Sequence, residues 1–221
     1  MKLSVIIPVF NEVDTILEIV ERVRRVPIEK ELVLVDDSSS DGSGEILSHL
    51  GSDADTTVLT HPVNSGKGAA IASGLRAAIG DVVVIQDADL EYDPNDFLKL
   101  IDPIEKGVSD VVYGVRDLSS QRMIMRAGNR LLTWIAGMLF GVRLQDMETC
   151  YKMMTRSVYQ LLTLECRRFD VEAEITAKIL RSGFSIYECP IQYNARYDNK
   201  KLSPLDGLPT LIALMKYRFF S

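Results

Sequence analysis

Short apolar runs alternate with segments of helical periodicity along the first hundred residues, and this order constrains the fold more than any other feature. The apolar runs are typical of buried strands, and they occupy residues 3–9, 31–35, 57–59 and 82–85. The segments expected to be helical lie between them, at residues 11–25, 43–50 and 69–79. Such alternation predicts an α/β fold in which helices flank a mostly parallel central sheet with right-handed crossovers.

Polar or acidic clusters follow three of these predicted strands at the points where the strands end. The clusters are residues 8–12, 36–40 and 87–91. The carboxyl ends of parallel strands meet at one edge of a sheet, and ligands of such sheets bind outside that edge. The sequence therefore predicts one ligand site to which all three clusters contribute.

The third cluster contains Asp87 and Asp89, which follow the apolar run at residues 82–85. Two carboxylates one residue apart in an extended chain project to the same side, so their charges repel unless a positive group neutralises them. A hard divalent cation that holds a diphosphate would do so. The alternative is a solvated strand-to-helix turn in which residues 93–96 cap the next helix.

The composition disfavours several functional classes. A net charge of −6 argues against a general nucleic-acid-binding protein. With only two histidines, neither a His-rich zinc site nor a Ser-His-Asp triad is favoured. Cys150, Cys166 and Cys189 form no C-x-x-C pair, which indicates no disulfide framework and predicts a reducing compartment.

The glycine-containing segment Asn64–Gly68 leads into a predicted helix without matching a standard phosphate-binding signature. It lacks the G-x-x-x-x-G-K-[ST] spacing, and no G-x-G-x-x-G follows the first strand, which disfavours a dinucleotide dehydrogenase. A loop that merely caps the helix remains open. Asp36 and Asp37 are either turn formers or acceptors of hydrogen bonds from a base or ribose.

The second half of the chain combines a basic row with an uncharged apolar segment. Residues 111–143 contain five arginines and one acid. Arg122, Arg126 and Arg130 recur every four residues, so a helix would present them along one side. The segment 131–142 carries no charge, includes the single tryptophan and is too short to span a bilayer. The pattern suits an interface with anionic lipid, or else a buried core helix with a solvated basic edge.

The sequence predicts neither a targeting signal nor a membrane-spanning segment. The N-terminal apolar run is short and lacks a small-residue cleavage site, so no signal peptide is predicted. No uncharged apolar stretch reaches about 18 residues, so no membrane-spanning segment is predicted. Residues 208–220 are amphipathic and are expected to lie on a membrane surface or to pack on the core.

Ordered motifs along nearly the whole chain resemble a known enzyme family. SVIIPVFNE, LVLVDDSSSDGS, NSGKGAAIASGLRAAIGD and VVIQDADLEYDP are similar to motifs of the family-two inverting glycosyltransferases, which have the Rossmann-like GT-A fold. QDMETCYKMMTRSVY and the segments after it resemble the polyprenyl-phosphate sugar synthases, the dolichyl-phosphate mannose synthase-like branch. The resemblance implies one domain, with a nucleotide-sugar-binding half at 1–100, an acceptor-binding half at 101–205 and a C-terminal amphipathic helix at 206–221.

The resemblance also implies an NDP-sugar donor bound with Mg²⁺ or Mn²⁺ at the strand ends. The residues implied to line the nucleoside are Pro8, Phe10, Glu12, Val35 and Asp37. Those implied to meet the ribose, the diphosphate and the metal are Asp87, Ala88, Asp89 and Glu91, with Asp89 and Glu91 at the metal. Phe10 stands where the family commonly has Tyr, and Glu91 where the mannose synthases commonly have Gln.

Basic residues are implied to bind phosphates. Arg116 and Lys201 would contact those of the donor, Arg196 would stabilise the leaving group, and the acceptor phosphate would meet Arg122 or Arg126. The family's R-x-x-G-E-S-K-L pattern appears here one residue short and without its glycine.

The implied reaction moves a hexose, with inversion, from a GDP-mannose or UDP-glucose type donor to a polyprenyl (dolichyl or undecaprenyl) phosphate. An ionised acceptor phosphate needs little help from a general base, and Glu148, Glu172 and Glu174 are the candidates if one is needed. The alternatives are transfer to a soluble saccharide or protein hydroxyl, and a non-catalytic nucleotide-sugar-binding subunit. The expected location is cytoplasmic, with peripheral contact to the membrane face or to a membrane-protein partner.

Overall fold

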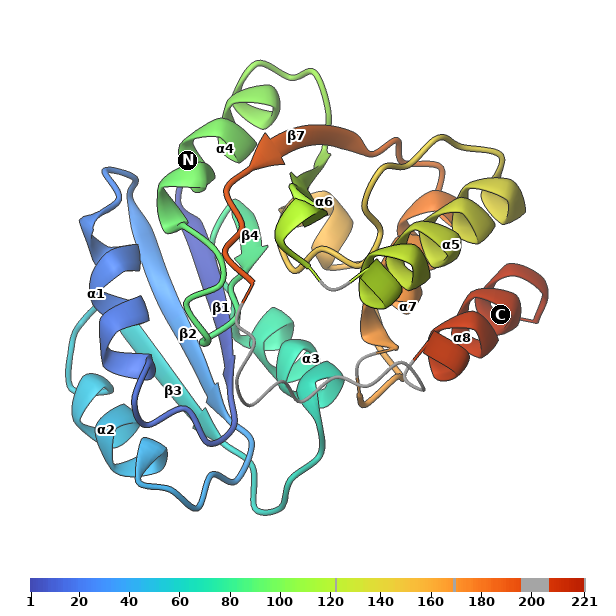
Figure 1. The fold of residues 1–221 in the computed structure, drawn as a ribbon. Coiled ribbons are helices and arrows are strands. Elements are labelled where there is room, and N and C mark those ends of the chain that lie inside the picture. Colours follow the sequence, from blue (N-terminus) through green and yellow to red (C-terminus); the bar gives the residue numbers. More distant parts are fainter. Residues whose placement is uncertain (122, 169, 196–206, 221) are drawn as a thin grey trace.

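The computed structural model describes residues 1–121, 123–168, 170–195 and 207–220 (Figure 1). Within them, one seven-stranded sheet has the strand order β3-β2-β1-β4-β6-β5-β7. The strands are β1 (Leu3–Val9), β2 (Lys30–Asp36), β3 (Thr56–Thr60), β4 (Val82–Ile85), β5 (Val111–Arg116), β6 (Lys152–Thr155) and β7 (Tyr187–Ile191).

The first four strands are mutually parallel, as the alternating sequence pattern predicts. β1 pairs with both β2 and β4, and β2 pairs with β3. β6 runs antiparallel between β4 and β5, and β7 is parallel to β5. Val9 lies opposite Asp36, and Ile6 lies opposite Ile85, so the chain leaves β1, β2 and β4 at the same edge of the sheet. The predicted α/β fold with a mostly parallel sheet is confirmed.

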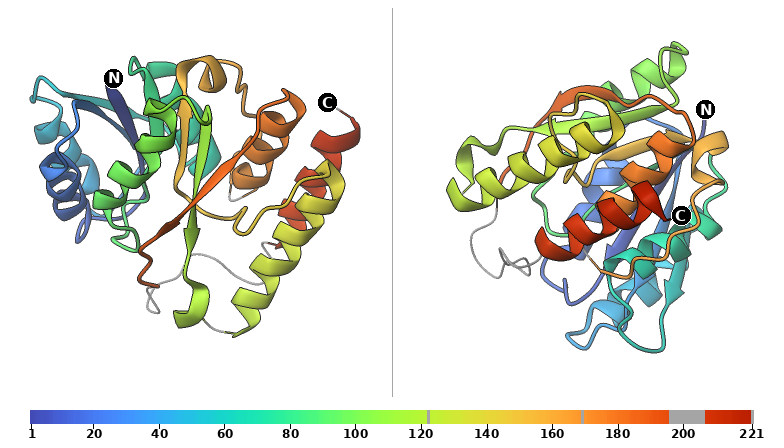
Figure 2. Two further views of the ribbon diagram at one scale, coloured as in Figure 1. Left: turned by 90° about the horizontal axis from the view of Figure 1, so that it is seen from above. Right: turned by 90° about the vertical axis from the view of Figure 1, so that its right-hand side faces the viewer.

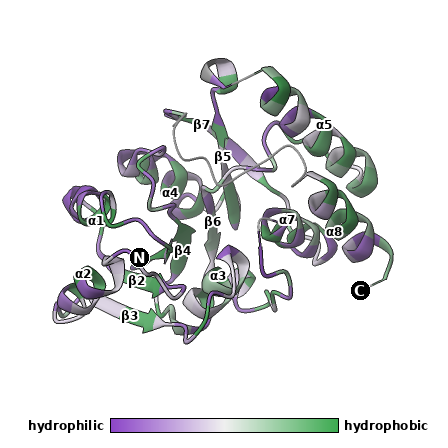
Figure 3. Ribbon diagram, turned by 60° about the horizontal axis from the view of Figure 1, so that its bottom comes forward, coloured by the Kyte–Doolittle hydropathy of each residue, from purple (hydrophilic) through white to green (hydrophobic). Residues whose placement is uncertain are grey.

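Helices cover both faces of the sheet. α1, α2 and α4 lie on one side, and α3 and α7 lie on the other (Figure 3). α5 and α8 run side by side and pack against α7 as an outer layer (Figure 2). The α-helices are α1 (Ile16–Arg25), α2 (Ser43–Leu50), α3 (Lys67–Ala77), α4 (Phe97–Glu105), α5 (Met123–Phe140), α6 (Arg156–Tyr159), α7 (Val171–Arg181) and α8 (Gly207–Phe219), and the 3₁₀ turns are η1 (Pro94–Asp96) and η2 (Leu118–Ser120).

The core lies between the sheet and the helices on either side. All four residues of β4 are buried, as a strand covered on both faces requires. α1 buries Ile16, Ile19, Val20 and Val23, which recur at the spacing of one helix face. Its outer face carries ion pairs between residues four apart.

The predicted helix at 11–25 is too long at its N-terminal end, because α1 begins only at Ile16. Asn11 has a positive φ of 53°, which a helix does not accommodate. Its N–H donates to Ser39 Oγ at 3.0 Å, and its Oδ1 accepts from Ser40 N–H at 2.8 Å. The segment after β1 is therefore held against the loop after β2, which brings two of the predicted polar clusters together.

The other local expectations concern helix ends and the basic, apolar region. Asp93 caps η1 by accepting from Asn95 N–H at 3.0 Å, as the turn interpretation predicts. Arg126, Arg130 and most of the apolar segment 131–142 form one helix, α5. No helix in the described part of the chain is long and apolar enough to cross a bilayer. The three cysteines are free.

A close approach between α3 and β1 generates the first testable prediction. A Cβ added at Gly74 would overlap Cγ2 of the buried Ile6, whereas a Cβ at Gly128 on α5 meets open space among the described residues. We expect Gly74→Ala to lower the free energy of unfolding by about 1–3 kcal/mol, because the core cannot absorb the extra methyl group. Gly128→Ala, the matched control, should be neutral or slightly stabilising. Urea unfolding followed by circular dichroism measures both, and equal midpoints would contradict the packing described here.

Candidate active site

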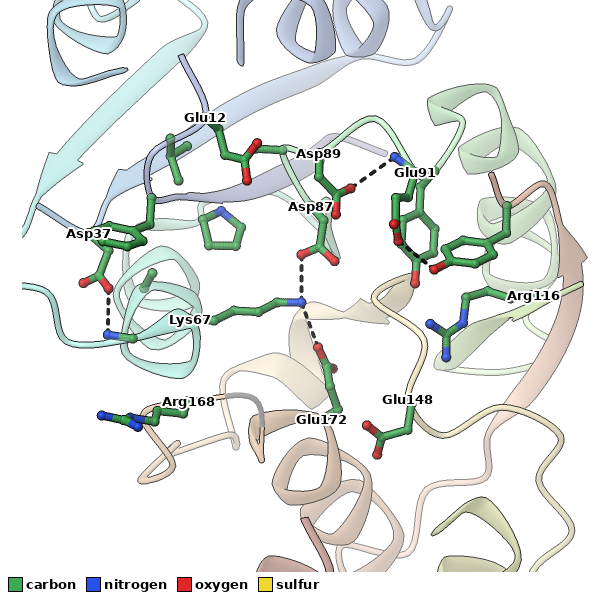
Figure 4. Close-up of a pocket in the computed structure, with 18 of the residues that line it drawn as sticks. Glu12, Asp37, Lys67, Asp87, Asp89, Glu91, Arg116, Glu148, Arg168 and Glu172 are labelled. Carbon is green, nitrogen blue, oxygen red and sulfur yellow. Dashed lines mark hydrogen bonds and ion pairs between the residues drawn. The ribbon is translucent and has the colours of Figure 1, made fainter. Parts of the chain in front are cut away.

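The carboxyl ends of β1, β2 and β4 open into a cavity of about 440 Å³ (Figure 4). The first turns of α3, α5 and α7 and the loop before β6 supply its other walls. The residues that the sequence analysis assigned to a ligand and that line this cavity are Pro8, Phe10, Glu12, Asp37, Asp87, Ala88, Asp89, Glu91 and Arg116.

Asp37, just after β2, lies at one end of the cavity and holds the loop before α3 in place. Its carboxylate is nearly fully buried and accepts from the backbone N–H groups of Ser65 at 2.8 Å and Gly66 at 2.6 Å. It also pairs with His61 Nδ1 at 2.7 Å. Asp37 therefore holds the glycine-containing loop before α3 against the sheet. A Cβ at Gly66 would collide with the backbone of Arg167, so only glycine fits at this closure.

The acidic cluster after β4 forms the middle of the cavity. Asp89 Oδ1 accepts from Glu91 N–H at 3.1 Å, and Glu91 Oε2 accepts from the Tyr193 hydroxyl at 2.6 Å. Burial raises the pKa of Asp89 to about 7, and the charges of Asp87 and Glu91 add to the rise. Negative charge is thus crowded at this edge, as the spacing of the two aspartates predicts.

Lys67, the first residue of α3, forms an ion pair with this cluster. Its Nζ lies 2.7 Å from Asp87 Oδ1 and 3.1 Å from Glu172 Oε1. Burial alone would lower the pKa of Lys67, but Asp87 and Glu172 raise it well above its ordinary value. Lys152, which is fully buried on β6, pairs with the other carboxylate oxygen of Glu172 at 2.9 Å. No role for Lys67 is predicted from the sequence, although its position directly after Gly66 at the start of a predicted helix is a signal that could have identified it.

Arg116, at the end of β5, lines the cavity but is already paired. Its Nε and Nη2 lie 2.7 and 2.8 Å from the two carboxylate oxygens of Asp146. Its guanidinium also lies over the ring of Tyr193, 5.2 Å from the centroid. A two-pronged pair of this kind fixes the guanidinium in place, so any phosphate contact must use its remaining N–H groups.

Several residues assigned from the resemblance do not line the cavity or cannot be placed. Val35 is fully buried in β2 and does not line the cavity. On α5 the cavity is lined by Met125 and Asn129 rather than by Arg126. Arg122, Arg196 and Lys201 lie outside the described residues.

The three glutamates considered as general bases differ in position. Glu148 and Glu172 line the cavity, and the exposed Arg168, which the sequence analysis did not single out, lines it as well. Glu174, on α7, is buried away from the cavity and accepts from the backbone N–H groups of Glu165 and Cys166. Burial, followed by the charge of Glu172, raises the pKa of Glu148 to about 7.

The donor set around Asp87 and Asp89 suits a divalent cation that is shared with a ligand. No three Asp, Glu, His or Cys side chains in the described segments are arranged to enclose a metal by themselves. Mg²⁺ sites commonly use one or two carboxylates together with substrate phosphates and water. The raised pKa of Asp89 fits this arrangement, because a cation would relieve the crowded negative charge.

Comparison with known proteins places these residues in context. An undecaprenyl-phosphate 4-deoxy-4-formamido-L-arabinose transferase from Pseudomonas fluorescens (strain Pf0-1) is 30% identical over 211 residues, covering 91% of this chain and 60% of the relative. A protein of the same description from Pectobacterium carotovorum is 38% identical over 119 residues, or 51% of this chain and 36% of the relative. The chain thus spans at most about 60% of the length of these curated relatives.

The fold is shared with glucosyl-3-phosphoglycerate synthase from Mycobacterium tuberculosis, solved with Mn²⁺, UDP-glucose and phosphoglyceric acid. That structure has a TM-score of 0.79 and 21% identity, and the match covers 98% of this chain and 79% of the other. It supports the predicted GT-A-like architecture. Residues 4–158, which make up most of the chain, match the family described as glycosyl transferase family 2. The chain therefore belongs to glycosyl transferase family 2.

Proposed function

We propose that this protein transfers a sugar from an NDP-sugar, with Mg²⁺ or Mn²⁺, to a polyprenyl phosphate. The observation that carries the proposal is the crowded pair Asp87 and Asp89, which lies in the middle of the cavity at the carboxyl edge of the sheet. The curated relatives, whose description names undecaprenyl phosphate as the acceptor, support the choice of acceptor class. A hexose donor of the GDP-mannose or UDP-glucose type remains our proposal for the sugar.

The donor would lie along the cavity in a defined direction. The nucleoside would occupy the end formed by Pro8, Phe10 and Asp37, and the diphosphate would lie beside Asp87 and Asp89. Ligands of parallel α/β sheets bind at this edge of the sheet. A divalent cation bound here would neutralise charge that develops on the leaving nucleoside diphosphate.

The reaction would be a direct displacement at the anomeric carbon of the sugar. An oxygen of the acceptor phosphate forms the new bond to carbon, and the bond from carbon to the diphosphate oxygen breaks with its electron pair, which inverts the configuration. The acceptor phosphate is already ionised near neutral pH, so it needs little proton transfer. Lys67 keeps Asp87 oriented, and the Arg116–Asp146 pair fixes the wall beside it.

α5, which lines the cavity, and its neighbour α8 present exposed apolar side chains, which we call the α5/α8 apolar face. On α5 it comprises Ile124, Leu131, Trp134 and Met138, and on α8 it comprises Leu208, Ile212, Met215 and Phe219. The opposite sides of both helices pack in a buried cluster with α7. The residues of the α5/α8 apolar face are therefore not part of the described core. Single exposed apolar residues are ordinary on a protein surface, but a group of them on two neighbouring helices indicates a binding surface.

We propose that an anionic membrane surface covers the α5/α8 apolar face. Arg130 and Arg218 are exposed on the same two helices, so positive charge accompanies the apolar side chains. Lys216 is exposed as well and is paired with Glu165 at 2.7 Å. Interfacial helices with basic residues and an aromatic anchor bind anionic lipid headgroups in this way. Met125 and Asn129 of α5 line the cavity, so docking through this helix would bring a lipid phosphate close to the donor.

Transfer to a soluble saccharide or protein hydroxyl is the second candidate function. It is favoured by Glu148, whose pKa of about 7 would suit a general base for a hydroxyl.

A transfer assay separates the two functions. With a panel of labelled NDP-sugars and either undecaprenyl phosphate or soluble saccharides, we expect labelled sugar to appear in the organic-extractable lipid. Transfer to saccharides without any lipid product would contradict the proposal and support the second function.

Asp89→Asn removes one negative charge with little change in shape. We expect it to abolish transfer and to weaken Mn²⁺-dependent binding of the NDP-sugar by at least about tenfold, which is about 1.4 kcal/mol. Asp102→Asn on the exposed side of α4 is the matched control and should retain both activities. Calorimetric titration with and without Mn²⁺ checks the binding. Full turnover of the Asp89 variant would rule out the proposed metal role.

Trp134→Glu and Ile212→Glu place a charge in the middle of the α5/α8 apolar face. Because each change replaces an apolar contact and adds repulsion, we expect binding to phosphatidylglycerol-containing vesicles to fall by about tenfold or more. Leu98→Glu, on exposed α4, is the control. Vesicle co-sedimentation measures the effect. Equal binding by all three variants would show that a different surface, or no surface, meets the membrane.

A further inference from the structure

Glu148 is an acidic residue of the cavity with one buried carboxyl oxygen that forms no hydrogen bond within the described part of the chain. It lies in the loop before β6 and lines the cavity near Arg116 and Glu172 (Figure 4). Its Oε1 is buried and has no hydrogen-bond partner within the described residues. By contrast, Asp87 is paired with Lys67 in the same cavity. A buried polar group without a partner is costly, so Glu148 needs an explanation.

The loop that carries Glu148 is held firmly on both sides of it. Met147 N–H donates to Thr133 Oγ1 at 3.1 Å, and Cys150 N–H donates to the Tyr92 hydroxyl at 3.0 Å. The buried Lys152 donates to the carbonyl of Met147 at 2.9 Å. These bonds fix the backbone on both sides of Glu148, so the fold places this residue at the wall of the cavity.

The charged groups facing Glu148 are already engaged with others. Arg116 is paired with Asp146, and Lys152 is paired with Glu172. Burial and the charge of Glu172 raise the pKa of Glu148 to about 7, although Lys152 and Arg116 act in the opposite direction and Asp146 adds a smaller rise. Arg116 and Lys152 are thus already paired with carboxylates other than that of Glu148.

Position along the cavity points to the ligand group that Glu148 meets. Asp37 marks one end, Asp87 and Asp89 lie in the middle, and Glu148 lies on the far side of Lys67 from Asp37 (Figure 4). With the nucleoside at the Asp37 end and the diphosphate at the two aspartates, the sugar attached to the diphosphate extends towards Glu148. This step rests on the proposed function.

We infer that Glu148 hydrogen-bonds a hydroxyl group of the sugar that is transferred and so helps to select that sugar. A hydroxyl both donates and accepts, so it pairs with a carboxyl group in either protonation state. The acceptor phosphate is a poorer match, because an ionised Glu148 would repel it. A site that hydrogen-bonds a particular hydroxyl discriminates strongly against a sugar that lacks it.

Calorimetric titration compares the wild type, Glu148→Ala and Glu148→Gln. The probes are UDP and GDP, and with them UDP-glucose and GDP-mannose, all in the presence of Mn²⁺. Glu148→Ala should weaken binding of whichever nucleotide sugar the wild type prefers by roughly tenfold to a hundredfold and leave the free diphosphate unchanged. Glu148→Gln keeps hydrogen-bonding capacity and should stay within roughly fivefold of the wild type. Glu105→Ala, on an exposed helix end, is the control.

Three results would overturn the assignment, and each is distinct. Unchanged nucleotide-sugar binding by Glu148→Ala would exclude a sugar contact. An equal loss of diphosphate and nucleotide-sugar binding would indicate a structural role. Loss of kcat in Glu148→Gln with unchanged affinity would assign Glu148 as a base instead. If the wild type binds none of the probes, the proposed function itself fails, which the wild-type titration reveals before any variant is compared.

A second measurement, independent of activity, tests whether the fold disfavours the ionised form of the Glu148 carboxyl group. Its folded-state pKa of about 7 lies above its ordinary value of 4.5. The unfolded chain therefore releases this proton at lower pH, and ionisation disfavours the folded state as pH rises from about 4.5 to 7. The Tm of Glu148→Gln relative to the wild type should rise between pH 5 and pH 8. A difference that stays constant or falls across this range would contradict the description of Glu148.

Discussion

Electrostatic repulsion at the end of β4 is the constraint on which the site depends. The parallel strands deliver Asp87 and Asp89 to the same edge as Asp37, and within the described residues the pairing of Lys67 with Asp87 offsets only part of the accumulated charge. Burial and its neighbours leave Asp89 with a pKa of about 7. A site with surplus negative charge inside a cavity favours a ligand that brings cations, and a diphosphate with its divalent ion has that character.

The sequence predicts those parts of the site that depend on local pattern. Apolar runs locate β1, β2 and β4, and the polar residues that follow them line the cavity because strand ends converge in a parallel sheet. The sequence does not predict which residues from distant segments of the chain will contact one another. Glu172 joins Lys67 to Lys152 only after α7 packs beside α3, and Arg116 is paired with Asp146 by the arrangement of β5 and the following loops. Val35 shows the same limit, since its burial is decided by packing rather than by its position near a strand end.

α5 links the two surfaces that a lipid-linked transfer needs. Its first turns contribute Met125 and Asn129 to the cavity, and its outer side contributes Leu131 and Trp134 to the α5/α8 apolar face. The helix is apolar on both its buried and its exposed sides, which is unusual for a helix that only supports a core. Of the two alternatives considered for this segment from the sequence, the structure shows that one side of the helix packs in the core. The interface with anionic lipid stays a prediction for the other side, which lacks a partner among the described residues.

Electron paramagnetic resonance of Mn²⁺ tests the central claim most directly, because it reports bound metal without requiring turnover. The account predicts that Mn²⁺ binds weakly to the protein alone and tightly once UDP or GDP is added, since two carboxylates and a diphosphate together complete the coordination. It also predicts that this ternary signal disappears in Asp89→Asn. Tight Mn²⁺ binding that ignores both the diphosphate and Asp89, or diphosphate binding that is the same with and without metal, would contradict the assignment of this edge as a cation–diphosphate site.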